Sequence, residues 1–433
     1  HCQCGHRRRP GRRVLLELGD AQVIAACRAQ WAALPAESQL AVMDADLKRG
    51  AESLPTVLAA TQSAHVSVRV AAWRALAVLN VPATVATLAQ AAAQGETAER
   101  DAARDTLARI HGPGVPEALF DEIGKSDVAV KAELLRVLGE RNEAGAVSVL
   151  LENASADAEP IRLAALESLR KLAAEEALAP LLALAGKQRP AADREPLLKA
   201  LYATCQASRN KDQAARLVID AINGAGAEQR RQFVAVLAAL GTPEALNVAQ
   251  KAAQDEDVEL AKEAVRVLAQ WPNATPAPQL LEMARSSKDS TLHALAMRGF
   301  VQLAGQVADP AERVALLSEA LTVARRVEEK RQALGQLGQV STLPALEAVL
   351  PHLADAGLAN EAGAAAVSIA EKLSDSQPQA AAEAAAKILA NCQSADIVRR
   401  AAALRGKPQS GSFLRDWLVC GPYRQAGVTG AEK

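Results

Sequence analysis

Residues 69–76 read RVAAWRAL, and residues 162–169 read RLAALESL. In both stretches the apolar side chains recur at steps of three and four residues, the spacing that places them on one face of an α-helix. Each stretch begins with a basic residue and continues as a wide apolar stripe. The two stretches therefore predict amphipathic helices of one repeated kind.

A basic residue opens this kind of block at regular intervals. Arg69, Arg100, Lys131 and Arg162 each lie 31 positions after the previous one. Further blocks, with gaps of 32, 36, 31, 32, 37 and 30 residues, open at Arg194, Arg230, Ala261, His293, Lys330 and Asn360. Recurrence at this period indicates a repeat array, in which ten blocks are visible. We expect the two longest gaps, which end at Arg230 and Lys330, to contain extended loops or altered curvature.

A second, shorter apolar helix is predicted before each block after the first. One of these helices follows the turn Gly241-Thr242-Pro243, where Thr242 can cap the helix and Pro243 occupies its first turn, in which no N–H is needed. Each unit is thus a helical hairpin. A single hairpin cannot bury both of its apolar faces, so successive hairpins must stack into an elongated solenoid.

This two-helix unit has an Asp or Glu shortly before a Val-Arg-x-Ala-Ala core, and in this it resembles the HEAT repeat, particularly its short bacterial form. The resemblance covers about residues 36 to 400. It implies an all-α, right-handed solenoid of stacked hairpins. It also implies that the second helices form an inner row with an extended concave surface.

The recurring basic residue has a structural interpretation in such an array. The resemblance implies a ladder in which carboxylates of the hairpin turns bond to Arg side chains or backbone N–H groups of neighbouring repeats. The turn carboxylates are Asp127, Asp157, Asp257 and Asp289. Candidate residues for the ladder or for the inner edge of the concave surface are Arg69, Arg100, Lys131, Arg162, Arg194 and Arg230. A stripe that binds phosphate groups is the alternative.

Composition fits a helical array better than a polyanion-binding surface. Half of the residues are hydrophobic but only 2% are aromatic, and 49 basic residues are balanced by 50 acidic ones. The net charge of −1 supplies no strong field to attract nucleic acid or anionic lipid. We expect Trp73, Trp271, Phe233 and Phe300 to pack in the core instead of shielding a base. A nucleic-acid partner is therefore not favoured, although a helical-repeat nucleic-acid binder stays an alternative.

No sequence motif indicates catalysis. The sequence contains no Gly-x-Ser-x-Gly elbow, phosphate-binding loop or His-Glu-x-x-His pair. The histidines at positions 65, 111, 293 and 352 fall in separate repeats, and we expect them to be solvated or to lie in turns. Cys27, Cys205 and Cys392 fall in distant helical stretches, where we expect small buried side chains. We therefore predict no catalytic residue, no cofactor and no metal site.

The first seventeen residues differ from the rest of the chain. Residues 1–17 are rich in arginine and poor in apolar residues, so we expect this segment to be disordered. Cys2 and Cys4 lie there beside histidines, but no second pair lies nearby to complete a zinc site. Because the sequence does not begin with Met, we expect a fragment or a processed chain, which is compatible with a removed signal peptide.

The last residues also change in character. Residues 406–433 begin as a linker, and residues 413–423 read FLRDWLVCGPY, which predicts a short β-strand ended by Gly-Pro. This stretch resembles the opening of β-sandwich modules in exported bacterial proteins that carry a 3-keto-disaccharide hydrolase domain. The resemblance implies a truncated β domain after a solenoid over residues 18–405, and a periplasmic or extracellular location. A cap on the final repeat is the alternative.

The function predicted from these features is a non-catalytic scaffold. Its concave helical surface would bind a protein partner or a neighbouring domain of the same polypeptide. The alternative is the N-terminal arm of a larger carbohydrate-active protein whose catalytic domain follows Lys433. No uninterrupted apolar run of 18 residues occurs, so we predict no membrane span.

Overall fold

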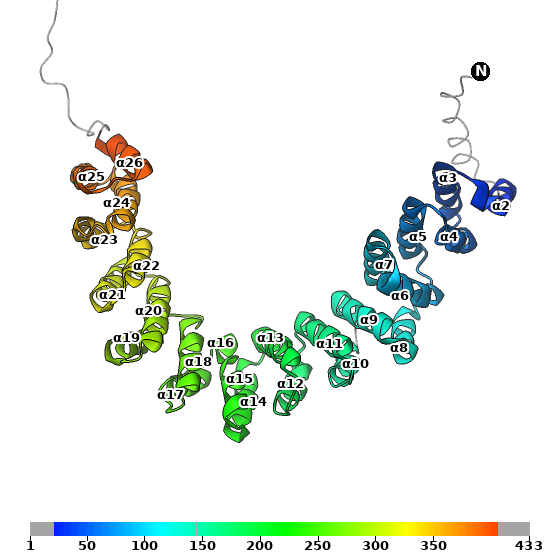
Figure 1. Cartoon of the computed structure of the whole chain (residues 1–433), viewed down its shortest axis with the longest axis horizontal. Helices are drawn as coiled ribbons and strands as arrows, with labels where there is room; N and C mark the ends of the chain where they lie inside the picture. Colours follow the sequence, from blue (N-terminus) through cyan, green and yellow to red (C-terminus); the bar gives the residue numbers. More distant parts are fainter. Residues whose placement is uncertain (1–20, 144, 406–433) are drawn as a thin grey trace, which may run out of the picture. The chain divides into compact units, whose positions relative to one another are not determined.

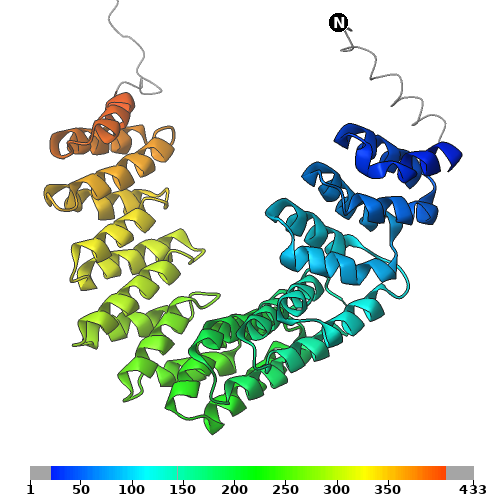
Figure 2. The ribbon, with the colours of Figure 1, turned by 45° about the vertical axis from the view of Figure 1, so that its right-hand side comes forward.

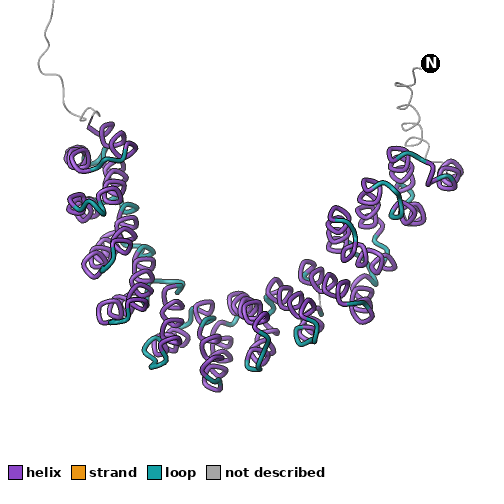
Figure 3. The backbone as a smooth tube through the Cα atoms, viewed as in Figure 1, coloured by secondary structure: helices purple, strands orange, loops and turns teal. Residues whose placement is uncertain are grey.

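The computed structural model describes residues 21–143 and 145–405. These residues form helices joined by short turns, and no strand occurs among them (Figure 3). This arrangement confirms the all-α solenoid predicted from the repeats. The predictions for residues 1–17 and for a β-strand at 413–423 concern residues outside these ranges.

The described helices fall into two compact units, with the boundary between Val248 and Ala249. The α-helices of unit 1 are α2 (Ala21–Ala29), α3 (Ala36–Leu47), α4 (Leu54–Ala60), α5 (Val66–Leu79), α6 (Val85–Gln94), α7 (Thr97–Arg109), α8 (Val115–Lys125), α9 (Val128–Arg141), α10 (Ala146–Asn153), α11 (Glu159–Leu172), α12 (Leu178–Ala185), α13 (Ala191–Ala207), α14 (Lys211–Gly224), α15 (Ala227–Val234) and α16 (Leu237–Leu240). Short 3-10 turns lie at Trp31–Ala33, Gly50–Ser53, Pro82–Thr84 and Glu175–Ala177.

The boundary lies within α17 (Pro243–Ala252), and the helices of unit 2 follow it. They are α18 (Val258–Ala269), α19 (Ala277–Ser286), α20 (Ser290–Ala304), α21 (Pro310–Val323), α22 (Val327–Leu337), α23 (Leu343–Val349), α24 (Ala359–Leu373), α25 (Pro378–Asn391) and α26 (Ala395–Arg405), with a 3-10 turn at Leu350–Ala354. The repeated blocks recognised in the sequence correspond to the second helices of these hairpins.

Within each unit the helices alternate between two rows (Figures 1 and 2). In unit 1 the first helices α4, α6, α8, α10, α12 and α14 form one row, and the second helices α5, α7, α9, α11 and α13 form the other. In unit 2 the second helices α18, α20, α22, α24 and α26 form a comparable row. Successive second helices contact each other, as α9 does α11 and α11 does α13. We call each row of second helices the inner row, because it lies on the inner side of its own unit.

Local chemistry explains where the hairpins turn. Thr242 Oγ1 accepts a hydrogen bond from the Ala245 N–H at 3.2 Å, and Pro243 is the first residue of α17, as predicted. Gly241 ends α16 in the left-handed region with φ of 68°, which a residue without a Cβ adopts at little steric cost. The cap and the turn are therefore both specified by the sequence at this hairpin.

Long helices fill the two longest gaps between blocks, so the extended loops expected as one explanation do not occur there, while altered curvature stays a prediction. The first helices α14 and α21 are each 14 residues long, whereas α6, α17 and α19 have 10 residues and α10 and α12 have 8. Side chains of Asn210 and Asp309 cap the two long helices at their N-termini. In the first of these gaps the second helix α13 is also longer, with 17 residues against 14 in α5, α9 and α11. The extra residues therefore lengthen helices, because they extend an apolar stripe that neighbouring helices cover.

Small and apolar side chains hold the inner row together. Leu138 of α9 and Leu169 of α11 are fully buried. The Ser168 hydroxyl of α11 donates to the Leu135 carbonyl of α9 at 2.8 Å. A Cβ on Gly139 would lie 2.7 Å from the Ser168 Cβ, so only glycine permits this close approach of α9 and α11. The core is thus a series of thin layers between neighbouring hairpins.

Candidate functional site

The six predicted basic residues share one structural position. Each is the fourth residue of its second helix, in α5, α7, α9, α11, α13 and α15, and each therefore lies beside a hairpin turn. The structure does not give them one role. What each side chain contacts depends on the residue that the next second helix places opposite it.

Arg162 joins its own turn to the next repeat. Its Nε lies 2.9 Å from Oδ2 of Asp193, the third residue of α13, and its Nη1 donates to the carbonyls of Asp157 at 2.6 Å and Ala156 at 3.1 Å. Asp193 has no exposed surface, and Arg162 is 7% exposed. Arg189 also donates to Asp193, at 2.9 Å. Two guanidinium groups therefore neutralise one buried carboxylate between α11 and α13.

Arg69, on α5 nearer the N-terminus, has the same arrangement. It donates to the Ser63 carbonyl in its own turn at 2.9 Å and to the carboxylate of Glu99, the third residue of α7. We call this arrangement a turn clamp. In a turn clamp, a basic residue at the fourth position of one second helix bonds to two groups. One is a backbone carbonyl of its own hairpin, and the other is a carboxylate at the third position of the next second helix.

His293 forms a third turn clamp, in unit 2. Its Nδ1 lies 2.7 Å from the Ala284 carbonyl oxygen near the end of α19, and its Nε2 lies 3.1 Å from Oε2 of Glu329, the third residue of α22. His293 is 1% exposed, so the expectation of a solvated or turn histidine was wrong. Its two ring nitrogens therefore connect its own hairpin to the next second helix.

The Glu329 carboxyl is held in its ionised form. Burial would raise its pKa, but hydrogen bonds from the backbone N–H groups of Arg326 and Arg325, together with the contact with His293, outweigh burial and lower the pKa from its ordinary value of 4.5. The two backbone hydrogen bonds measure 3.1 Å and 2.8 Å. Glu329 therefore also caps the start of α22 while it bonds to the preceding repeat.

Replacing Glu329 by glutamine is expected to lower the free energy of unfolding by about 2 kcal/mol at neutral pH, because hydrogen bonds to a charged group are lost. A pKa that is lowered in the folded state stabilises the protein above the ordinary value and loses this effect as pH falls through the folded value. The difference between wild type and Glu329→Gln should therefore shrink in acid. Urea unfolding at a series of pH values measures it, and a difference that grows toward low pH would contradict this assignment.

Arg100 and Lys131 form no turn clamp. The third residue of the next second helix is Val130 after Arg100 and Ile161 after Lys131, and both are buried and apolar. Arg100 is exposed and contacts only Thr97 of its own helix, at 3.5 Å. The regular spacing of the four basic residues therefore does not produce a regular ladder, because the acceptor is missing at two of the steps.

Arg194 and Arg230 differ again. Arg194 pairs with Glu228, the second residue of α15, at 2.8 Å, and both side chains are about half exposed. The third residue of α15 is Gln229, which has no charge to offer. Arg230 is half-buried at the fourth position of α15. The assignment of all six residues to a binding surface stays a prediction.

Three of the four turn aspartates form their side-chain hydrogen bonds within their own hairpins. Asp127 accepts a hydrogen bond from the Val130 N–H at 2.9 Å, and Asp257 and Asp289 likewise cap α18 and α20. Hydrogen bonds from the backbone N–H groups of Leu292 and Thr291 lower the pKa of the Asp289 carboxyl. Asp157 takes part in a clamp through its backbone carbonyl only. An aspartate just before a helix satisfies that helix first, since the unpaired N–H groups lie within reach.

The carboxylates of the turn clamps were not predicted from the sequence. They are Glu99, Asp193 and Glu329, and each directly precedes the basic residue of its own block. A signal was present, because this third position is Val, Ile or Leu in several second helices and is acidic in the helices that contain Glu99, Asp193 and Glu329. It could be interpreted only with knowledge that the third residue of one second helix faces the fourth residue of the previous one.

The inner row of unit 1 presents charges that compensate each other. Arg104 of α7 and Arg136 of α9 both bond to Glu133, at 2.9 Å and 2.6 Å. Hydrogen bonding to Glu133 raises the pKa of the Arg104 guanidinium. Lys171 of α11 bonds to Glu140 of α9 at 3.3 Å. These three basic side chains are therefore compensated, which weighs against a continuous positive stripe for a phosphate backbone on this part of the row.

The aromatic residues named in the sequence analysis are buried. Trp73 is 6% exposed, Trp271 and Phe233 are 2% exposed, and Phe300 is fully buried. This confirms their expected place in the core. They are consequently not displayed as a platform on which bases or sugars could stack.

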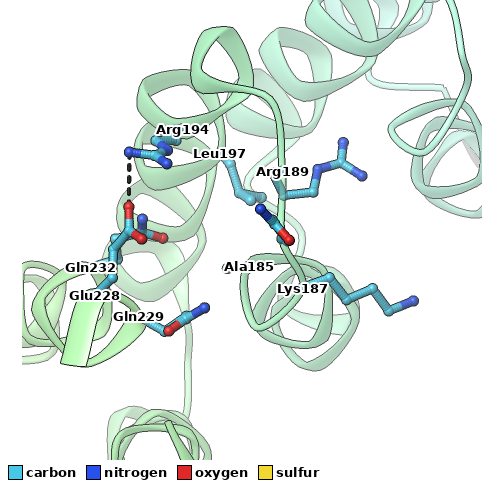
Figure 4. Close-up of a pocket in the computed structure, with 9 residues that line it drawn as sticks. Ala185, Lys187, Arg189, Arg194, Leu197, Glu228, Gln229 and Gln232 are labelled. Carbon is cyan, nitrogen blue, oxygen red and sulfur yellow. Dashed lines mark ion pairs between the residues drawn. The ribbon is translucent and has the colours of Figure 1, made fainter. Parts of the chain in front are cut away.

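A pocket of about 200 Å³ lies in unit 1, lined by the turn that follows α12 and by the helices α13 and α15. Figure 4 shows its lining residues. Arg194 and Glu228 pair on one side of the pocket, while Lys187 and Arg189 on the other side point away from this pair. Arg189 is engaged by Asp193 and by the Ala154 carbonyl. The lining residues include no hydroxyl, thiol or imidazole group, and the one carboxylate among them, Glu228, is paired with Arg194.

Groups that could bind a metal do not gather in residues 21–143 and 145–405, where no three His, Cys, Asp or Glu side chains form a cluster. Cys205 and Cys392 are buried as expected, and Cys27 is half-buried. Burial raises the pKa of the Cys205 thiol to about 12, so this thiol is not a reactive nucleophile. Among the described helices, none is long and apolar enough to cross a bilayer.

Stacked helical hairpins with a mixed-charge inner row define the class of this protein as a helical-repeat solenoid. Within that class, a family model of HEAT repeats matches residues 116–202 and 215–299. The match spans hairpins of both units. It supports a HEAT-repeat protein, in agreement with the resemblance seen in the sequence.

Solved structures of longer solenoids have a similar fold. One is Kap95p in its complex with RanGDP, with a TM-score of 0.50 and 14% sequence identity over 91% of this chain and 62% of that chain. Another is the karyopherin Kap121p bound to the SUMO protease Ulp1p, with a TM-score of 0.54 and 13% identity over 91% of this chain and 51% of that chain. The likeness is one of fold, and this chain spans about half to three fifths of their length. No curated protein matches the sequence.

Proposed function

We propose that this chain is a non-catalytic scaffold whose inner rows bind a protein partner or a neighbouring domain of the same polypeptide. The observation that carries the proposal is the inner row of unit 1, which displays charges of both signs over several repeats and gathers no catalytic group. Mixed charges suit a protein surface, which itself carries both signs. The fold is compatible with this function, because solenoids provide extended surfaces for partners.

The solved neighbours support the same class of function. The Kap121p structures include complexes with Ulp1p and with RanGTP, which are both proteins. The compensated charges between α7 and α11 weigh against the alternative of a nucleic-acid binder. The pocket of Figure 4 weighs against turnover, since its one carboxylate, Glu228, is paired with Arg194 and no imidazole, thiol or hydroxyl lies beside it.

Site-specific crosslinking tests whether the inner row is the binding surface. A photoreactive amino acid replaces Asp105, an exposed residue of α7 in the inner row, or Asp121, an exposed residue of α8 in the other row. We expect the Asp105 position to crosslink to one defined protein in extracts of the source cells, and the Asp121 position to give little product. Equal crosslinking from both positions, or glycoside hydrolysis by the purified chain, would contradict the proposal.

A further inference from the structure

A polar groove lies between α20 and α22 on the inner row of unit 2. Its cavity measures about 480 Å³. Its lining is unusual because it consists mainly of side-chain amides beside one guanidinium group. The lining residues are Arg298, Val301, Gln302, Gln332, Gly335, Gln336 and Gln339.

The polar groups of this groove are not used by the fold. Arg298, Gln302, Gln332 and Gln339 are exposed, and their side chains make no hydrogen bond or ion pair with any described residue. Other arginines of this row differ, since Arg266 of α18 pairs with Glu263 at 2.8 Å and Arg331, outside the groove lining, pairs with Glu361 at 3.5 Å. In this groove the Arg298 guanidinium therefore lies beside glutamine side chains, and the lining contains no carboxylate.

Gly335 is a second feature that the fold does not require. It lies in the last turn of α22, and within a helix glycine is up to about 1 kcal/mol less favourable than alanine. A Cβ added there would meet no atom within 4 Å, so packing does not demand its absence. It is the ninth residue of its helix, and the ninth residues of α5, α7, α9, α11, α13, α18 and α20 are Arg74, Asp105, Arg136, Glu167, Lys199, Arg266 and Arg298.

A bare backbone at this point lets another main chain approach closely. Gly335 thus replaces the charged side chain that covers the same position in many other second helices. The surrounding amides can each donate and accept a hydrogen bond, which matches the N–H and C=O of a peptide group. The groove is open, so it cannot enclose a small molecule in the way that ligand pockets do. It also lacks an aromatic side chain on which a base could stack.

We propose that this groove binds an extended polypeptide segment of the partner, with the main chain over Gly335 and an acidic side chain paired with Arg298. The inference rests on the proposed scaffold function and assigns its recognition site. The amides hold the main chain, and the guanidinium selects for a carboxylate through charge-assisted hydrogen bonds. Binding here needs no rearrangement of α20 or α22.

The test uses the full chain and a displayed library of short random peptides as the probe. We expect selected peptides to be enriched in Asp and Glu and to bind in a fluorescence polarisation assay. Arg298→Glu should weaken binding by about tenfold or more, because it places like charges together. The matched control is Arg74→Glu, which changes an exposed arginine at the same helix position in unit 1 and should leave the affinity unchanged.

Substitutions of Gly335 test the groove by two measurements, thermal stability and peptide affinity. Gly335→Ala should raise the thermal stability of the protein, while Gly335→Leu should weaken peptide binding by about tenfold because its side chain fills the groove. Selected peptides that are not acidic, or that bind Arg298→Glu and Gly335→Leu as tightly as wild type, would overturn the inference. If these variants still crosslink to the partner from position 105, the groove assignment fails and the scaffold proposal stands. If the wild-type chain gives no inner-row crosslink, the scaffold proposal fails.

Discussion

Replacing Leu169 by aspartate is expected to lower the free energy of unfolding by about 4 kcal/mol or more. Leu169 is fully buried in α11, which contacts α9, α10 and α13. The substitution removes an apolar side chain from between two layers and leaves a carboxylate there without a partner. Urea unfolding followed by far-UV circular dichroism measures the loss.

The matched control is Val78→Asp, in which the same charge is placed on a second helix at a side chain that is 70% exposed. Its effect should stay within about 0.5 kcal/mol. Because each hairpin contacts only its neighbours, hydrogen exchange in Leu169→Asp should accelerate first in α9, α11 and α13. Uniform acceleration throughout both units, or equal losses from the two variants, would refute the layered core.

Replacing Asp193 by alanine is expected to destabilise the protein by about 3 to 5 kcal/mol, because breaking a buried ion pair leaves uncompensated charge behind. Asp193 has no exposed surface and accepts hydrogen bonds from Arg162 and Arg189. Both guanidinium groups would lose their carboxylate, although Arg162 would keep the carbonyls of its own turn. The same urea titration gives this value.

Arg100→Ala is the control for the clamp, since Arg100 holds the same helix position without a carboxylate partner. An exposed residue of this kind should contribute less than about 0.5 kcal/mol. The contrast separates the clamp from the mere presence of a basic residue at the fourth position. If Arg100→Ala and Asp193→Ala were equally harmful, the base alone would stabilise the turn and the pairing across repeats would be irrelevant.

Half of the turn clamp could be predicted from the sequence. The base was visible because it recurs with the period of the repeats, as Arg69 and Arg162 show. Its partners Glu99 and Asp193 were not recognised, since a carboxylate beside an arginine within one helix indicates nothing about contacts between helices. The pairing depends on the register of α5 against α7 and of α11 against α13, and tertiary packing sets that register.

For His293 the position in the repeat could be predicted from the sequence, but its contacts could not. Its place at the fourth position of a block was known from the repeat spacing, yet its chemistry was interpreted as that of an exposed residue. The structure buries it between the Ala284 carbonyl and Glu329. A histidine at this position can reach the same two kinds of partner as arginine, because its two ring nitrogens contact a carbonyl of its own hairpin and a carboxylate of the next second helix.

The sequence alone determined the helical hairpins, their caps and their stacking, because the three- and four-residue spacing of apolar side chains and the turn residues at Gly241 and Thr242 act locally. Only the tertiary structure decided which basic residues are clamped, that the long gaps became long helices, and that Gly335 opens a groove beside unpaired amides. Those features arise where side chains of successive repeats meet. A local pattern contains the identities of the residues but not the register that brings them into contact.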